Sequence, residues 1–302
     1  MSKKRKVIDV YGIVQGVGFR PFVYNLAIKN SLTGYVNNNS NGVIIDIQGE
    51  EDNLKAFIVE LSKNPPLLSK IKKVKITEKK VNQKYTDFYI KLTEKNISPT
   101  TYISPDYSIC DKCKTEIFDK NNKRYRYPFT NCTCCGPRFS IIKDLPYDRD
   151  LTTMNEFEMC ESCKAEYNNP ENRRFHAQPN ACPECGPIVF LSKSNGELIK
   201  YEDPLTETIK LIKEGNIIAV KGLGGFNLSC DAKNEETIRL LRKRKKRPQK
   251  PFAVMMRDLE VVKKYCNLSK EEEAVLLSNK RPIVLLEKNK NYGLPNNLAP
   301  NN

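Results

Sequence analysis

Cys110-Asp-Lys-Cys113 is the first of four two-cysteine knuckles, and it is followed by Cys132-Thr-Cys-Cys135, Cys160-Glu-Ser-Cys163 and Cys182-Pro-Glu-Cys185. Eighteen residues separate the two knuckles of each pair, and the second pair lies 50 positions after the first. The repeat is not limited to cysteine, because the same offset matches Glu116 with Glu166 and Arg124 with Arg174, and Gly136-Pro137 with Gly186-Pro187. The stretch is therefore a tandem duplication of one unit.

The spacing of these cysteines favours two structural zinc ions per chain. Two C-x2-C turns can place four thiolates around one tetrahedral cation, and the interval between the turns is typical of zinc sites. A disulfide framework would need an oxidising compartment, and no signal peptide opens the chain. Iron–sulfur clusters use other spacings. Cys134 is interpreted as a spare thiol, and ligand pairing within each copy is simpler than pairing across copies, which stays open. The predicted ligands are Cys110, Cys113, Cys132, Cys135, Cys160, Cys163, Cys182 and Cys185.

Composition restricts the class of protein and its partners. The chain has 302 residues, enough for two or three domains, and contains no apolar run long enough to span a membrane. A net charge of +15 favours anionic partners such as phosphates and nucleotides. Eleven cysteines without a secretory leader indicate a reducing, cytoplasmic location. A single histidine excludes mechanisms that need several.

Residues 7–92 are predicted to form one small domain. Alternating apolar residues and turn signals mark the strands, whereas the i, i+3, i+4, i+7 pattern of Leu54, Phe57, Ile58 and Leu61 marks a helix. Another helix begins at Pro21. The order strand–helix–strand–strand–helix–strand is typical of the ferredoxin-like split βαβ fold. The predicted strands are Val7–Val14, Gly34–Asn38, Val43–Gln48, Lys73–Lys79 and Tyr85–Leu92.

The loop after the first strand, Gln15-Gly16-Val17-Gly18-Phe19-Arg20, has the residues of an anion cradle. Its glycines allow the backbone N–H groups to approach an anion, and the helix that follows adds its dipole. Arg20 can clamp a phosphoryl group through its planar fork. The alternative is a tight turn with Arg20 as a surface charge.

The loop and its surroundings resemble the acylphosphatase signature. The run from Gly12 to Arg20 carries it, together with Gly34-Tyr35-Val36-Asn37-Asn38, Asn41-Gly42-Val43 and Gln48-Gly49. The resemblance implies catalytic roles for two residues: Arg20 binds the phosphoryl group and Asn38 orients the attacking water. It also implies that no general base is needed, because an acyl phosphate has a good leaving group. The implied phosphate-binding residues are Gln15, Gly16, Val17, Gly18, Phe19 and Arg20.

From about residue 200 the pattern predicts an α/β unit. Helices are expected at 205–212, 235–245, 259–266 and 271–278, and strands at 217–221, 227–230, 252–256 and 282–287. Lys221 beside a glycine-rich turn, and a basic run from Arg242 to Lys250, favour a nucleotide phosphate; a solvated helix end is the alternative. The segment from Lys245 to Pro251 resembles an element of the YrdC/Sua5 fold, which implies ATP binding. The nucleotide-binding residues are then Lys221, Lys245, Arg247 and Lys250.

The order of these parts resembles the HypF family, the carbamoyltransferases of nickel–iron hydrogenase maturation. The fold class is then α+β multidomain, with an acylphosphatase domain at 5–93, a zinc-finger module at 106–190 (fingers at 110–135 and 160–185) and a YrdC-like domain at 200–302. The resemblance implies that carbamoyl phosphate is cleaved at Arg20 and Asn38. ATP with magnesium then converts carbamate to carbamoyl-adenylate, and the carbamoyl group reaches the C-terminal cysteine of HypE, where it becomes a cyanide ligand of iron.

Family members are longer, so we expect the YrdC-like domain to be truncated at its carboxyl end. Acyl phosphate hydrolysis is expected of this chain, whereas complete transfer to HypE is not. The rival hypothesis is a stand-alone acylphosphatase with a zinc-finger module that binds protein or nucleic acid. Nucleic acid is not expected as a partner despite the basic charge, and binding that falls steeply with salt would distinguish that case.

Overall fold

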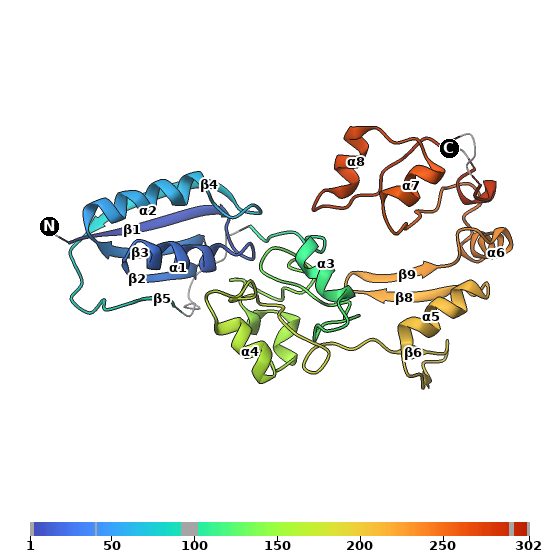
Figure 1. Ribbon diagram of the computed structural model, residues 1–302, viewed down its shortest axis with the longest axis horizontal. Coiled ribbons are helices and arrows are strands. Elements are labelled where there is room, and N and C mark those ends of the chain that lie inside the picture. Colours follow the sequence, from blue (N-terminus) through green and yellow to red (C-terminus); the bar gives the residue numbers. More distant parts are fainter. Residues whose placement is uncertain (1–2, 40, 92–101, 290–292, 301–302) are drawn as a thin grey trace. The chain divides into compact units, whose positions relative to one another are not determined.

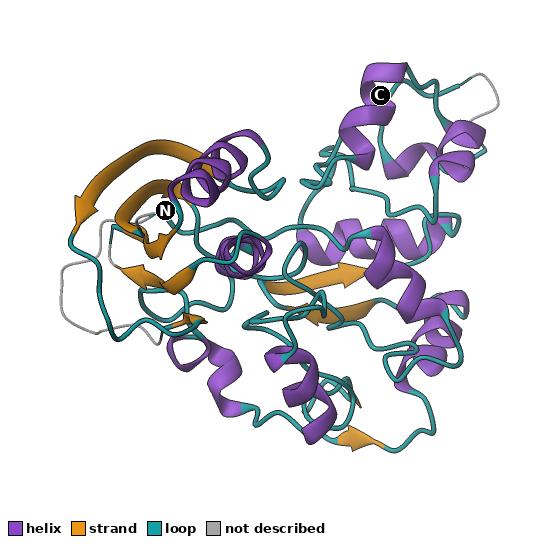
Figure 2. Cartoon of the chain, turned by 60° about the vertical axis from the view of Figure 1, so that its left-hand side comes forward, coloured by secondary structure: helices purple, strands orange, loops and turns teal. Residues whose placement is uncertain are grey.

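The computed structural model describes residues 3–39, 41–91, 102–289 and 293–300 (Figures 1 and 2). The chain divides into two compact units, Met1–Pro187 and Ile188–Asn302, which are described separately. The first unit contains the predicted acylphosphatase-like domain and both pairs of cysteine knuckles, so contacts between those two parts lie within one unit.

The amino-terminal domain has the predicted split βαβ order. Its sheet has the strand order β4-β1-β3-β2-β5, and all neighbouring pairs are antiparallel except β2 with β5. The prediction for residues 85–92 was too long, since only three of them form a strand, and Leu92 lies outside the described residues. The elements are β1 (Lys4–Ile13), α1 (Phe19–Lys29), β2 (Thr33–Asn39), β3 (Gly42–Gly49), α2 (Glu51–Lys63), β4 (Lys70–Lys79) and β5 (Phe88–Ile90).

Helices α1 and α2 contact each other and pack on β3, which closes the core on one face of the sheet (Figure 1). The apolar periodicity explains this packing, because Leu54, Phe57 and Leu61 of α2 are all buried against it. Asn38 lies at the end of β2 opposite Val43 of β3. This register brings the end of the hairpin to the loop that joins β1 to α1.

The finger module has little regular structure. Each first knuckle lies at the start of a short helix, α3 (Asp111–Phe118) or α4 (Glu161–Asn168), and two 3-10 turns, η1 (Arg149–Leu151) and η2 (Thr153–Glu156), lie between the copies. Cys110 and Cys160 are the N-cap residues of the two helices. The cysteines themselves form much of the small buried cluster in the first copy. The segment between the amino-terminal domain and the finger module lies partly outside the described residues.

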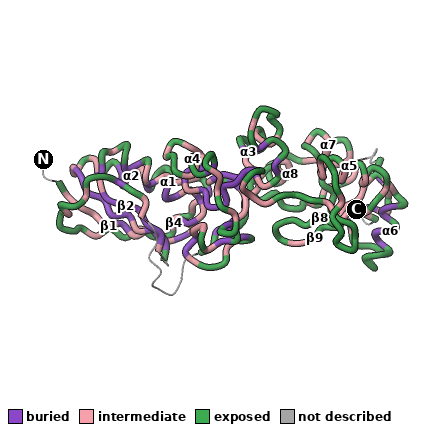
Figure 3. The backbone as a smooth tube through the Cα atoms, turned by 90° about the horizontal axis from the view of Figure 1, so that it is seen from below, coloured by how far each residue is buried: buried purple, intermediate pink, exposed green. Residues whose placement is uncertain are grey.

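The second unit contains the predicted helices and, among its described residues, two antiparallel hairpins, β6–β7 and β8–β9. Its buried cluster is small, centred on Ile238, Leu294 and Leu298, and Figure 3 shows that β8 and β9 are largely exposed. The elements are β6 (Leu191–Ser192), β7 (Leu198–Ile199), α5 (Pro204–Lys213), β8 (Ile218–Gly222), β9 (Gly225–Ser229), α6 (Glu235–Lys245), α7 (Leu259–Tyr265), α8 (Lys270–Leu277) and η3 (Asn296–Leu298).

The predicted strands Phe252–Met256 and Pro282–Glu287 are wrong, because both segments are irregular. A strand needs a neighbour for its backbone N–H and C=O groups, and the β8–β9 sheet has only two strands. Met255, Ile283 and Leu285 remain 98%, 80% and 75% exposed. Apolar alternation in these segments therefore does not lead to pairing.

No helix in the described parts of the chain is both long enough and apolar enough to cross a membrane.

Candidate active site and metal centres

The loop between β1 and α1 has the backbone shape of an anion cradle. Gly16 and Gly18 have φ of 70° and 74°, in the left-handed region that glycine adopts without strain. Gly18 is also the N-cap of α1, so the first N–H groups of that helix face the loop. Val17 and Phe19 bury their side chains in the core, which leaves only their backbone N–H groups for an anion.

Arg20 and Asn38, 18 positions apart in sequence, meet beside this loop. With the amide oxygen of Asn38 directed at the guanidinium, Oδ1 accepts hydrogen bonds from Nε and Nη2 of Arg20, both at 3.2 Å. Asn38 is buried, and the Arg20 residue is 9% exposed. The structure thus brings together the two residues for which the sequence predicts catalytic roles.

A segment of the finger module, residues 147–149, covers Arg20 and Asn38. Oδ1 of Asp148 lies 2.6 Å from Nη2 of Arg20, and the same nitrogen donates to the carbonyl of Tyr147 at 3.4 Å. Arg149 holds the segment in place, because its guanidinium donates to the carbonyls of Gln178 and Phe157, both at 2.6 Å. Arg20 therefore faces an anionic group of its own chain.

Gln15 positions the loop through its side chain. Its Nε2 donates to the carbonyls of Asn39 and Gly42 at 2.7 and 2.8 Å, and its Oε1 accepts from the N–H of Tyr147 at 3.1 Å. These bonds use both amide hydrogens and the oxygen, so the side chain connects the loop, the β2–β3 hairpin and the covering segment. Its predicted role in phosphate binding can only involve its backbone.

The cavity around Arg20 is lined from both domains. Gly16, Gly18 and Asn38 lie on one side, and the finger module contributes Thr133, Arg138, Tyr147, His176 and Gln178 on the other. The sequence predicted none of these five finger residues as site residues. Their separation from the loop exceeds 100 positions, and no local spacing indicates the contact.

His176 is a neutral member of this cavity at physiological pH. Burial, and then the positive charge of Arg20, lower the pKa of His176 to about 4. Its ring packs on Tyr167 and Phe175, with centroids 4.9 and 4.7 Å apart. It belongs to neither cysteine cluster. Its repeat counterpart Arg126 has a similar φ, 57° against 51°.

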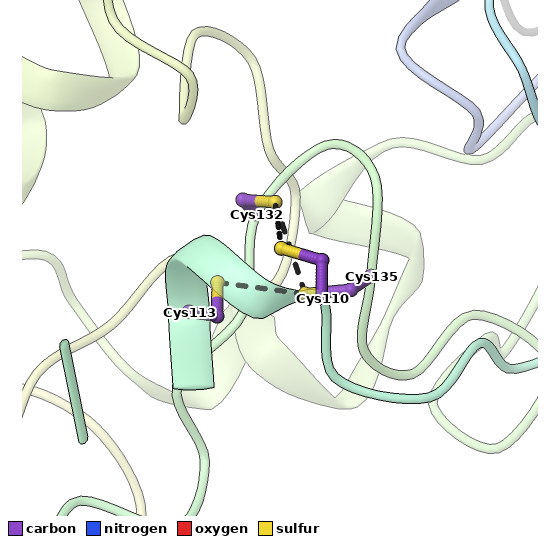
Figure 4. Close-up of side chains that lie close together, drawn as sticks. All are labelled: Cys110, Cys113, Cys132 and Cys135. Atoms are coloured by element: carbon purple, nitrogen blue, oxygen red, sulfur yellow. Dashed lines mark hydrogen bonds between the residues drawn. The ribbon is translucent and has the colours of Figure 1, made fainter. Parts of the chain in front are cut away.

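The eight predicted ligands form two four-cysteine clusters, one within each copy. Figure 4 shows the first, where neighbouring Sγ atoms of Cys110, Cys132, Cys135 and Cys113 lie 3.8, 3.7 and 3.5 Å apart. A zinc ion with Zn–S bonds of about 2.3 Å gives tetrahedral edges of about 3.8 Å. The second cluster contains Cys160, Cys163, Cys182 and Cys185.

These distances decide the pairing that the sequence left open. Sulfur atoms more than 3 Å apart are not disulfides, and all eight cysteines are free thiols. Each cluster draws on one copy only, and Cys134 belongs to neither. Four thiolates around one point leave no open position, so the donor set fits zinc in a structural role.

The two fingers exchange ion pairs at the positions that repeat in the sequence. Arg124 of the first copy binds Glu166 of the second through two bonds of 2.9 and 2.6 Å, and Arg174 binds Glu116 in the reverse direction. The exchange extends to the sulfurs, since Nη2 of Arg124 lies 3.5 Å from Sγ of Cys163. Nη2 of Arg173 lies 3.0 Å from Sγ of Cys113. Each cluster therefore has a guanidinium from the other copy beside it.

The electrostatics of this exchange keep both glutamates ionised. Burial alone would raise the pKa of Glu166, but the hydrogen bond and charge of Arg124 outweigh it and hold the pKa at about 2. At Glu116 burial again favours a higher pKa, but Arg174 and Arg173 outweigh it and lower the pKa. Arg124, Arg173 and Arg174 thus direct their charge to glutamates inside the module.

Among the described residues, no single contact joins the four predicted nucleotide-binding residues. The guanidinium of Arg247 donates hydrogen bonds to the carbonyls of Pro251 and Lys250, at 2.7 and 3.4 Å. Lys245 ends α6, whereas the ammonium of Lys221 lies over the ring of Phe226. Arg242, which the sequence placed only in a basic run, organises the loop by donating to the carbonyls of Arg247, Pro248 and Lys250.

Comparison with known families assigns the three parts of the chain. A family model described as acylphosphatase matches residues 6–90. The HypF finger model matches 109–142 and 159–192, so each copy of the repeat is one match. A Sua5/YciO/YrdC model, described as telomere recombination, matches 210–302.

Whole-chain relatives combine all three parts. A protein of Methanocaldococcus jannaschii named probable carbamoyltransferase HypF is 51% identical over 96% of this chain. A crystal structure of full-length HypF in its phosphate- and nucleotide-bound form matches with a TM-score of 0.92 and 49% identity over 99% of the chain. An acylphosphatase of Bacillus licheniformis is 41% identical over 30% of this chain and 98% of its own length.

The chain spans 38% of the length of the archaeal relative and 39% of the crystallised HypF chain. The order and nature of its parts, and the close match of its fold, nevertheless agree with HypF throughout. The chain therefore belongs to the HypF family, with an acylphosphatase domain, two HypF fingers and a Sua5/YrdC-type domain.

Proposed function

We propose that this chain hydrolyses an acyl phosphate, with carbamoyl phosphate as its substrate. The observation that carries the proposal is the meeting of Arg20 with Asn38 at a loop whose two glycines have positive φ. A buried guanidinium at a helix N-terminus suits a phosphoryl group, because both supply positive charge where water is excluded. The names of the longer relatives support carbamoyl as the acyl group.

The proposed reaction needs positioning more than proton transfer. Backbone N–H groups of the loop and the fork of Arg20 bind the phosphoryl oxygens, and Asn38 orients a water in line with the leaving group. Water attacks phosphorus, the bond to the carbamate oxygen breaks, and phosphate and carbamate are released. Carbamate is a good leaving group, so electrostatic stabilisation and orientation account for catalysis without a general base. The neutral His176 agrees with a pocket that lacks a strong base.

We propose that carbamate then attacks the α-phosphorus of ATP, with magnesium, at the Sua5/YrdC-type domain, which gives carbamoyl-adenylate and releases pyrophosphate. Lys221, Lys245, Arg247 and Lys250 are the proposed phosphate contacts there. In the complete family reaction the carbamoyl group would pass to the C-terminal cysteine of HypE. We place this reaction in the cytoplasm, where thiolate–zinc centres remain reduced. Nucleic acid is not proposed as a partner, because guanidiniums of the fingers pair with Glu116 and Glu166.

Phosphate release from carbamoyl phosphate, measured with and without ATP, tests the proposed function. We expect hydrolysis by the 302-residue chain without ATP, since the acylphosphatase part carries the loop, Arg20 and Asn38. Zinc content of two per chain serves as the control for folding. A zinc-loaded chain that releases no phosphate above the uncatalysed rate would contradict the proposal.

Asp148 is expected to oppose binding of the phosphate. Its carboxylate lies 2.6 Å from the Arg20 nitrogen that a phosphoryl oxygen would take, and two anions on one guanidinium repel each other. The Asp148→Asn variant keeps the shape of the side chain and removes its charge. We expect it to bind inorganic phosphate about tenfold more tightly than the wild type, measured by isothermal titration calorimetry.

Asp150→Asn is the matched control for that measurement. Asp150 lies two residues away and is exposed, so its replacement changes the net charge equally without touching Arg20. Its phosphate affinity should equal that of the wild type. Weaker binding by Asp148→Asn would mean that the carboxylate orients Arg20 for phosphate instead of competing with it.

A further inference from the structure

Arg138 connects the first finger to the loop of residues 15–20, which we call the phosphate loop. The residue is 2% exposed, and its guanidinium reaches five backbone carbonyls, which matches its five N–H donors. Nε donates to the carbonyl of Gly16 in the loop. The remaining bonds go to the finger: Nη1 donates to Cys135 and Pro137, at 3.1 and 2.8 Å, and Nη2 donates to Cys132 and Thr133, at 2.9 and 3.0 Å.

Two of these acceptors belong to residues of the first cysteine cluster. Cys132 and Cys135 carry thiolates of that cluster, and their carbonyls hold the two ends of the Arg138 fork. When the thiolates share one metal ion, the turn between them has a fixed shape, and so do its carbonyls. The orientation of Arg138 therefore depends on the first cluster.

The contact is specific to the first copy of the repeat. Position 188, which follows Arg138 by 50 residues, is Ile188 and is 69% exposed. Both copies share the Gly-Pro dipeptide directly before this position. The two copies thus share the turn but differ in the side chain that bonds to the Gly16 carbonyl in the first copy.

The bond from Arg138 acts on the part of the loop that would face an anion. In a trans peptide the C=O and N–H groups point in opposite directions, so a fixed Gly16 carbonyl also fixes the Val17 N–H. The approach is close, because a Cβ at Gly16 would lie 3.1 Å from Cδ of Arg138 and 3.3 Å from the Tyr147 ring. Arg138 therefore sets the direction of an N–H group in the cradle.

We propose that Arg138 is a positioning residue that holds the phosphate loop in its anion-binding shape, and that the first four-cysteine cluster controls it. The inference rests on the proposed function only for the identity of the anion. Stand-alone acylphosphatases match this domain over nearly their whole length, so such loops work without a finger. In this chain the loop has instead become linked to a metal centre.

This arrangement makes zinc and phosphate binding mutually dependent. If an occupied first cluster orders the loop through Arg138, zinc raises the affinity for phosphate, and phosphate raises the affinity for zinc by the same factor. The second cluster has no corresponding arginine and should not share in the effect. The coupling is therefore assigned to one cluster and one side chain.

The first test measures binding of inorganic phosphate to the 302-residue chain by calorimetry, with zinc content determined in parallel. We expect Arg138→Gln to weaken phosphate binding about tenfold or more at full zinc content, since a charge-assisted bond to the loop is lost. Arg138→Lys keeps the charge but cannot reach five carbonyls, and it should also bind more weakly. Arg124→Gln, an equally buried arginine that bonds only within the fingers, should leave phosphate affinity unchanged.

The second test is a cycle of zinc removal and mutation, run in the Asp148→Asn background so that release of that carboxylate does not contribute. Chelation should weaken phosphate binding about tenfold when Arg138 is present, and should add nothing when it is Gln. Phosphate binding does not require hydrolysis, so a chain that binds phosphate without cleaving carbamoyl phosphate would contradict the proposed function and leave this inference testable.

Three results would overturn the inference. One is wild-type phosphate affinity in Arg138→Gln. Another is wild-type affinity in Arg138→Lys, which would show that only the positive charge near the loop matters. The third is equal phosphate affinity of the zinc-loaded and chelated forms in the Asp148→Asn background. If Arg138→Gln does not retain zinc, two other measurements still test the inference. They are the phosphate affinity of Arg138→Lys and the effect of chelation on the phosphate affinity of the chain that keeps Arg138.

Discussion

Replacing Arg20 with alanine lowers the rate of acyl phosphate hydrolysis by about a thousandfold, according to the site geometry. The guanidinium is the cation that the cavity places beside both the loop and Asn38. Its loss removes a bidentate contact to the charge that develops on the phosphoryl oxygens, and water cannot replace that contact in a buried site. The measurement is steady-state phosphate release from carbamoyl phosphate, with zinc content to verify folding.

Arg20→Lys separates charge from geometry in the same experiment. An ammonium retains the charge but cannot bind two oxygens and Asn38 at once, so we expect this variant to recover only a small part of the activity. Both variants should keep two zinc ions, since Arg20 contacts no cysteine of either cluster. Normal turnover by Arg20→Ala would end the catalytic assignment of this residue, whatever the behaviour of the lysine variant.

The parts of the site that could be predicted from sequence are those encoded by neighbouring residues. Gly16, Gly18 and Arg20 lie within one loop, and the hairpin carries Asn38 to the same end of the sheet. The cysteines follow a spacing that zinc chemistry dictates. In each case local backbone geometry determines where the side chain lies, so a pattern in the sequence is sufficient.

The missed residues depend on contacts between distant segments. Asp148 and Arg138 lie more than 100 positions from the loop, and His176 lies farther still. Nothing in their local sequence indicates that they would cover Arg20, because the contact arises from packing of the finger module on the domain. The repeat comparison did find Glu116 and Arg174, but a match between copies does not reveal that the two side chains pair across copies.

The wrong strands have a related cause. Phe252–Met256 and Pro282–Glu287 contain the apolar residues that favour strands. The sequence pattern shows only which sides of such a segment are apolar, not whether a neighbouring strand is present. Pairing depends on a neighbouring strand, whereas among the described residues each segment makes one backbone hydrogen bond to another segment: Phe252 donates to Leu298, and Glu287 accepts from Asn267. Local preference without a partner for the backbone therefore does not produce a sheet.

Loss of one buried ligand is expected to have the largest effect on the fold of the finger module. In Cys113→Ser the first cluster loses a fully buried thiolate. Zinc binding to such a site contributes about 10 kcal/mol or more to folding, and a small module has little other core to replace it. Arg173 also loses the sulfur that lies 3.0 Å from its Nη2, which weakens the bracing between the fingers. We therefore expect at most one zinc per chain.

Cys134→Ser provides the matched control, because Cys134 lies between two ligands and is exposed, outside both clusters. This variant should keep two zinc ions, measured by elemental analysis after gel filtration, and wild-type hydrogen exchange across residues 110–185. Cys113→Ser should lose exchange protection across both copies, since Arg124, Arg174 and their glutamates connect them. Protection lost only in the first copy would show that each finger folds independently, and the exchanged ion pairs would then contribute little to stability.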